Sequence, residues 1–276
     1  MSILSENIDS IGLEFECYLS DPCRFKKELK RAPYNYELIG DTFNAEKQRF
    51  KAETIAVGTD GSVQGEFCFN HNDNRNRNHT SMEDDDEYID WFQIDRSVNS
   101  LEIRSKWKYN DNVINDINDY AQFLFRYFKQ NYTCGNHIHL SFNNNTRIAS
   151  VAFTYKNIWH RFISDYKNYF AGKEKYINRF KNKYCRSRYN LNNITRIITS
   201  NYSSGDRYYA INLMAFRKHK TVEFRIMPYA ENADEYVSQI RWLLKEIETI
   251  FTRNHSSVSS VPFLNERIRH DRYIFI

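Results

Sequence analysis

Apolar and polar residues alternate in several short stretches of the chain, and this period of two is typical of β-strands that bury one face. Strands are predicted in residues 12–18, in a region punctuated by Asp60-Gly61-Ser62 that ends near residue 69, in residues 100–107, around residues 137–140, and in residues 207–216 and 220–229. The last two runs are expected to form a hairpin that turns through residues 217–220.

Apolar residues recur every three or four positions in other segments, which predicts amphipathic helices. These helices are expected over residues 111–129, residues 151–169 and residues 237–251, and a basic, tyrosine-rich helical region is expected up to residue 200. The last helix begins after acidic residues, which suit a helix N-terminus. Strands separated by helices indicate an α+β fold, with a mainly antiparallel sheet covered by helices on one face.

The composition is that of a globular protein. The 276 residues are 41% hydrophobic and 16% aromatic, and they contain no internal repeat and no Pro/Gly-rich linker, so a single domain over residues 1–276 is expected. Residues 70–90 are polar and are interpreted as a surface insertion. No apolar run reaches the ~18 residues of a membrane span. The N-terminus lacks a signal-peptide pattern and the five cysteines lack paired metal spacing, so reduced thiols and a cytoplasmic location are expected.

Positive charge is concentrated in one segment. The chain has a formal net charge of +4, but residues 171–200 contain eight basic residues and only one acidic residue. Such a segment favours anionic ligands, whether nucleotide, acidic substrate or nucleic acid, although a solvated helix face is an equally good interpretation.

Strand alternation also predicts a polar face that carries most of the candidate chemistry. It places together the side chains of Glu14 with Glu16, His137 with His139, Glu223 with Arg225, and Glu102. Each pair alone is typical of a solvated strand face or a cross-strand ion pair. If the strands are neighbours, each carboxylate pair repels by about 1 kcal/mol in water and about 4 kcal/mol at an effective dielectric of ~20. Arg225 supplies one compensating charge, and Mg²⁺ or Mn²⁺ is the expected remainder.

Six short motifs occur in a fixed order between Gly12 and Arg225. They are G-L-E-F-E, D-G-S, L-E-I-R-S, C-G-N-H-I-H, R-Y-Y-A-I-N-L and T-V-E-F-R. This series resembles the amidoligase family, which is similar to glutamine synthetase and glutamate–cysteine ligase. The chain departs from the family pattern after Ser105, where Lys106-Trp107 stands in place of a frequent proline. Residues 70–90 and 171–200 have no counterpart.

The resemblance implies a glutamine synthetase-like catalytic fold and an ATP-dependent carboxylate–amine ligase. Such an enzyme would use two Mg²⁺ or Mn²⁺ ions and an acyl-phosphate intermediate to join a carboxylate substrate to an amine substrate, either of them a small molecule, a peptide or a protein. The implied ligands of one ion are Glu14, His137 and Glu223, and those of the other are Glu16 and Glu102.

Further roles follow from the same resemblance. Asp60 would orient or deprotonate the amine, and Arg207 and Arg225 would bind ATP and neutralise the transferring phosphoryl group. From the basic segment, and not from the resemblance, Arg186 and Arg188, with Arg196, are candidate contacts for the nucleotide or an acidic substrate, with a solvated surface an equally good interpretation. Ser62, His139 and Asn212 would support the site.

Two other functions fit parts of the sequence. A metal-dependent hydrolase would use the same carboxylates and histidines to activate water. A nucleic-acid-binding protein would use Tyr184, Tyr189 and Tyr202 as stacking partners beside the basic segment, but this leaves the clustered carboxylates unexplained.

Overall fold

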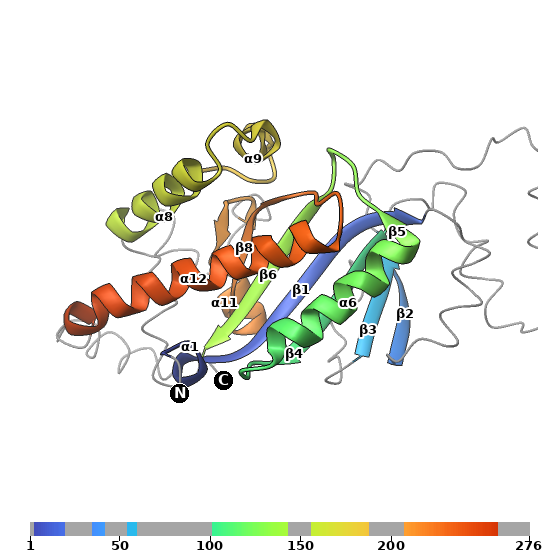
Figure 1. Ribbon diagram of the computed structural model, residues 1–276, viewed down its shortest axis with the longest axis horizontal. Helices are drawn as coiled ribbons and strands as arrows, with labels where there is room; N and C mark the ends of the chain where they lie inside the picture. Colours follow the sequence, from blue (N-terminus) through green and yellow to red (C-terminus); the bar gives the residue numbers. More distant parts are fainter. Residues whose placement is uncertain are drawn as a thin grey trace, which may run out of the picture.

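The computed structural model describes residues 3–19, 35–41, 54–59, 101–142, 156–187 and 207–258. Its strands form one sheet (Figure 1). They are β1 (Ile8–Leu19), β2 (Asn35–Asp41), β3 (Thr54–Thr59), β4 (Leu101–Lys108), β5 (Phe128–Lys129), β6 (Gly135–Phe142), β7 (Ile211–Asn212) and β8 (Thr221–Pro228). The helices are α1 (Ile3–Asn7), α6 (Val113–Tyr127), α8 (Lys156–Tyr169), α9 (Glu174–Asn178), the 3-10 helix η3 (Arg179–Lys181), α11 (Met214–His219) and α12 (Ala233–Val258).

The sheet is mostly antiparallel and does not close on itself. Its strand order is β2-β3-β4-β1-β6-β8-β7, with β5 paired to the end of β1. The pair β2–β3 is parallel, whereas β1 runs antiparallel to both of its long neighbours, β4 and β6. The fold is therefore α+β, as the alternation of strands and helices predicts.

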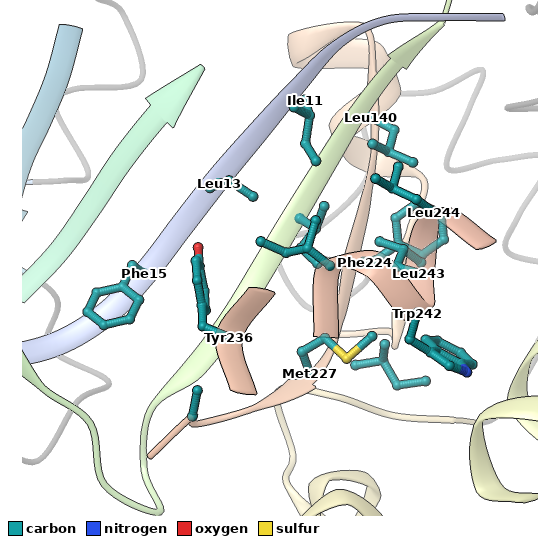
Figure 2. Packing of buried hydrophobic residues seen from close by; sticks show 14 of the residues in the cluster. Ile11, Leu13, Phe15, Leu140, Phe224, Met227, Tyr236, Trp242, Leu243 and Leu244 are labelled. Atoms are coloured by element: carbon teal, nitrogen blue, oxygen red, sulfur yellow. The ribbon is translucent and has the colours of Figure 1, made fainter. Parts of the chain in front are cut away.

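One face of this sheet is apolar and is covered by helices. In Figure 1, α12 and α6 lie across the strands, and the close view in Figure 2 shows Leu13 and Phe15 of β1 beside Tyr236 of α12. The Phe15 and Tyr236 rings meet edge to face with their centroids 5.4 Å apart. Leu140 and Phe224 are fully buried on the same face. Burial of this surface, at about 25 cal/mol per Å², drives the assembly of helices on sheet.

The strands β1, β4, β6 and β8 and the helices α6, α8 and α12 lie where the hydrophobic pattern predicts them. The strand predicted for residues 207–216 is wrong for most of its length, because only Ile211–Asn212 is extended and α11 replaces the hairpin. Asn212 explains this switch, since its Oδ1 accepts a hydrogen bond from the Met214 N–H at 3.0 Å and so starts the helix.

Other expectations meet the limits of the described ranges. The strand β2 was not anticipated, and β3 ends at Thr59, just before Asp60. Residues 60–100 and 188–206 lie outside the described residues, so the insertion at 70–90 and the end of the basic segment are not placed. Among the described helices, none has the length and apolar character needed to cross a membrane.

A β-bulge interrupts the pairing of β6 with β8 beside His137. Asn136 pairs with Met227 and Ile138 pairs with Phe224, so the single residue His137 faces both Arg225 and Ile226. The carbonyls of the two bulged residues accept side-chain hydrogen bonds. Arg179 of η3 donates Nε–H to the Arg225 carbonyl at 3.1 Å, and Tyr166 of α8 donates its hydroxyl to the Ile226 carbonyl at 2.8 Å. The bulge thus attaches two separate helical segments to the strand pair.

Candidate metal centre

The face of the sheet opposite α6 and α12, which we call the polar face, gathers polar side chains from five adjacent strands. Their positions follow the registers, in which Glu16 pairs with Glu102, Glu14 pairs with His137, and His139 pairs with Glu223. The contributors are Glu102 and Arg104 of β4, Glu14 and Glu16 of β1, His137 and His139 of β6, Glu223 and Arg225 of β8, and Asn212 of β7. Strand pairing, combined with the alternation of side chains along each strand, therefore brings together residues that lie up to about two hundred positions apart in the sequence.

Glu14 lies at the centre of this group. Its Oε2 is 3.0 Å from His137 Nδ1, and its Oε1 is 3.2 Å from His139 Nε2 and 3.7 Å from Arg104 Nε. Burial by itself would raise the pKa of Glu14. The charges of His139 and Arg104 and the hydrogen bonds from both histidines outweigh that effect and hold the pKa well below its usual value. Glu14 is therefore anionic at neutral pH.

Glu223 is held from two sides. Asn212 Nδ2 donates to its Oε2, and Arg225 Nη1 donates to its Oε1. Burial would raise the pKa of Glu223, but the charge of Arg225, followed by that of His139, lowers it. Arg225 is itself fixed, because its Nε–H donates to the Tyr184 carbonyl at 3.2 Å.

Glu16 and Glu102 have their own partners. Glu16 Oε2 accepts a hydrogen bond from the Gly135 N–H at 2.5 Å, so this carboxylate leans toward the start of β6. Glu102 accepts a hydrogen bond from Arg104 Nε. Both glutamates are almost fully buried, at 4% and 5% exposed.

His139 presents a buried nitrogen toward the carboxylates. Its Nδ1 lies 3.0 Å from Thr221 Oγ1, and its buried Nε2 faces Glu14 Oε1 at 3.2 Å. Burial lowers the pKa of His139, but the charges of Glu14 and Glu223 outweigh burial and raise it. Gly12 stands opposite His139, where an added Cβ would approach the His139 Cβ to 3.2 Å, so the glycine leaves room for the ring.

Two overlapping groups of side chains could hold a cation. One is Glu14 with Glu102 and His137, and the other is Glu14 with His139 and Glu223; in each, the candidate ligand atoms lie within 4.8 Å of one another. An octahedral Mg²⁺ with bonds of about 2.1 Å separates its ligand atoms by roughly 3 to 4 Å. The oxygen-rich sets with one imidazole therefore fit Mg²⁺ or Mn²⁺ with small adjustments. Glu14 belongs to both groups, and Glu16 to neither.

Two arginines that were not predicted from the sequence join Arg225 on this face. Arg104 lies two residues after Glu102 and shares its side of β4, so the alternation rule could have found it. Arg179 also enters the site, from η3, and its Nη2 is 3.3 Å from His137 Nε2. No periodicity in the sequence points to Arg179, because its position depends on how a separate segment packs. Three arginines thus offset much of the charge of four glutamates among the described residues.

The arginines predicted to contact the nucleotide lie in different surroundings. Arg207 places its guanidinium carbon 5.0 Å from the Tyr208 ring centroid, and its Nε is buried without a hydrogen bond to any described residue. Arg225 lies 6.0 Å from the same ring, so the two arginines gather beside Tyr208. Arg186 is exposed and covers the Tyr209 ring at 4.6 Å. Four other predicted site residues lie outside the described ranges: Asp60, Ser62, Arg188 and Arg196.

Comparison with known proteins gives one match. Residues 74–246, more than half of the chain, match the model of a family described as "Putative amidoligase enzyme". Neither the search of curated proteins nor the search of solved structures returned a match. The matched range contains the polar residues of β4, β6, β7 and β8, and β1 precedes it.

Proposed function

The chain belongs to the amidoligase family, and from this premise we propose that it joins a carboxylate to an amine with ATP as the phosphoryl donor. The observation that carries the proposal is the position of Glu14, a partly buried anion shared by two Glu/His groups on a face that also holds arginines. A ligase of this kind must neutralise the phosphates of ATP while it keeps a carboxylate substrate nearby, and this combination of charges suits that task.

The proposed reaction has two steps. An oxygen of the substrate carboxylate attacks the γ-phosphorus of ATP, the bond from that phosphorus to the bridging oxygen breaks, and ADP leaves. The amine then attacks the carbonyl carbon of the acyl phosphate, the carbon–oxygen bond breaks, and inorganic phosphate leaves with one oxygen of the original carboxylate. The amine loses a proton to a base, for which Asp60 is the proposed candidate.

Each described residue has a limited role in this proposal. Glu14, Glu102 and His137, or Glu14, His139 and Glu223, would hold divalent ions, which when bound supply positive charge to the phosphates. Arg225 is braced by Glu223 and by the Tyr184 carbonyl, so its remaining N–H groups are pre-oriented toward an anion. Arg207 also lies beside the Tyr208 ring and adds a second positive charge.

Isotope transfer tests this proposal. The full chain would be incubated with ATP, Mg²⁺ or Mn²⁺, an amine mixture and carboxylates labelled with ¹⁸O, and the inorganic phosphate would be analysed by mass spectrometry. We expect one ¹⁸O atom to pass into phosphate for each amide formed. Phosphate without label or without amide would contradict the acyl phosphate. Metal-dependent amide cleavage without ATP would instead indicate the hydrolase.

A further inference from the structure

Arg179 belongs to the basic segment but does not behave as a surface residue. Its side chain extends from η3 to the strands β6 and β8, and the residue is only 6% exposed. Its Nε–H donates to the Arg225 carbonyl at the bulge, and its Nη2 lies 3.3 Å from His137 Nε2. Both ends of the guanidinium are therefore engaged, one by the backbone of β8 and the other by an imidazole of β6.

Gly135 provides the space that this guanidinium occupies. A Cβ built on Gly135 would lie 1.9 Å from Arg179 Nη2 and 2.6 Å from its guanidinium carbon, far inside van der Waals contact. The Gly135 N–H meanwhile donates to Glu16 Oε2. The glycine of the C-G-N-H-I-H motif thus admits Arg179 on one side and orients Glu16 on the other.

The chemistry of the two side chains restricts what His137 can do. A guanidinium has five N–H donors and no acceptor, and a neutral imidazole has one lone pair available for acceptance. The Arg179 contact therefore uses the lone pair of Nε2 and leaves the proton on Nδ1, which donates to Glu14 Oε2 at 3.0 Å. A metal ion also needs an imidazole lone pair. Arg179 and a metal ion cannot use His137 at the same time.

We propose that Arg179 is a positioning residue that holds His137 by its Nε2 and must release it before His137 can ligate a divalent ion. The inference rests on the metal use in the proposed function and deepens it by giving an order of loading. Glu14, His139 and Glu223 would hold the first ion, because His139 Nε2 already faces Glu14 Oε1 at 3.2 Å, whereas His137 Nε2 meets the Arg179 guanidinium. The second ion binds Glu14, Glu102 and His137, and it does so only as Arg179 withdraws.

Titration of the full chain with Mn²⁺ alone, followed by electron paramagnetic resonance, tests this order. Arg179→Met removes the competing donor. Gly135→Ala keeps the positive charge but takes away the space for it, so both variants should act in the same direction. We expect each to tighten the weaker Mn²⁺ site by on the order of tenfold or more, since the ion no longer competes with a charged donor. Lys181→Met, which removes an exposed charge from the same 3-10 helix, should bind as the unaltered chain does.

Pulsed resonance with ¹⁵N-histidine separates positioning from a merely structural role. In the unaltered chain the first Mn²⁺ should couple to one imidazole nitrogen, which is lost in His139→Gln, and a second coupling should appear at low Mn²⁺ only in Arg179→Met and Gly135→Ala. Circular dichroism checks the folding of each variant, and Arg179→Gln, which also removes the charge, replaces Arg179→Met if that variant unfolds.

Three results would overturn the inference. Unchanged or weaker Mn²⁺ binding in both variants would refute competition by Arg179. Coupling of the first ion to His137 in the unaltered chain would refute the order. Absence of Mn²⁺ binding in every variant would remove both the inference and the metal use in the proposed function, whereas the first two results leave the proposed function standing.

Discussion

The two faces of the same strands are built by different physical rules. On the covered face, Leu13, Phe15 and Phe224 are held by burial against helices, and any apolar group of similar shape would serve. On the polar face, Glu14 and Glu223 are held by side-chain donors at hydrogen-bond distance, and a substitution there leaves a partner unsatisfied. The covered face therefore contributes mainly to stability, and the polar face carries the charged groups of the candidate site.

This contrast predicts that stability and activity separate cleanly between neighbouring residues. Adjacent positions on one strand face opposite layers, so paired substitutions one residue apart compare the two sides in the same local backbone.

Phe224→Ala should give the largest loss of stability. Phe224 is fully buried, and its ring centroid lies 5.5 Å from that of Phe162 on α8. Truncation leaves a cavity and should lower the free energy of unfolding by about 3–5 kcal/mol, measured by urea denaturation. The exposed Lys108→Ala is the control and should change it by less than about 0.5 kcal/mol. A loss below about 1 kcal/mol at Phe224 would show that the covered face is not a close-packed core.

Glu14→Gln should lower activity far more than stability. The substitution keeps the size of the side chain but removes the anion shared by both cation groups. We expect ATP turnover to fall at least about 100-fold, roughly 2.7 kcal/mol of transition-state stabilisation, with a smaller change in the free energy of unfolding. Steady-state phosphate release measures the first and denaturation the second, with the exposed Asp119→Asn as control. Undiminished turnover would remove Glu14 from the site.

Arg225→Lys should have an intermediate effect. The arginine binds Glu223 through Nη1 and the Tyr184 carbonyl through Nε, and a single ammonium cannot reproduce both contacts. We expect turnover to fall by about tenfold, or ~1.4 kcal/mol. Arg126→Lys, on the exposed end of α6, should have no effect. If the two variants have equal turnover, Arg225 takes no part in the chemistry.

A small pH effect is expected where a polar pair interrupts the helical layer. Burial, reinforced by the charge of Asp165 on α8, raises the pKa of Glu246 on α12 to about 7. The folded state thus retains a proton that the unfolded state releases near pH 4.5, so stability falls as the pH rises between these values. Because the site is partly exposed, the loss should be about 1 kcal/mol or less.

Glu246→Gln imitates the protonated form and isolates this effect. The variant should unfold at a higher Tm than the unaltered chain at pH 8, and the two should converge near pH 4.5. Thermal melts across this range make the comparison. A constant difference in Tm at all pH values would show that Glu246 does not titrate with folding.

Which residues lie on the polar face follows largely from the alternation of side chains along a strand and was therefore predictable. Glu14, His137 and Glu223 share a side because strand residues two apart always do, and their strands pair because the opposite side of each is apolar. The family match supports the order of motifs on β4, β6 and β8. The predicted division of ligands between two ions is not decided by alternation, since it depends on side-chain direction within one crowded face.

The features that escaped prediction depend on contacts between distant segments. The alternating pattern of residues 207–216 does not indicate that a helix begins there. The helix start depends on a local capping bond from Met214 N–H to Asn212 Oδ1, which periodicity cannot predict. Arg179 sits in a segment whose charge pattern resembles a solvated helix face, and only the packing of η3 beside Gly135 turns it inward.

A slip of one residue between β6 and β8 would send every side chain of one strand to the wrong side. The bulge guards against that error, because Tyr166 and Arg179 find the carbonyls of Ile226 and Arg225 only when the two strands are aligned as described. In a misaligned pair each of these donors would be buried without an acceptor, at about 1–3 kcal/mol apiece. The docking of α8 and η3 on these two carbonyls therefore favours the strand register that places His137 opposite the bulge.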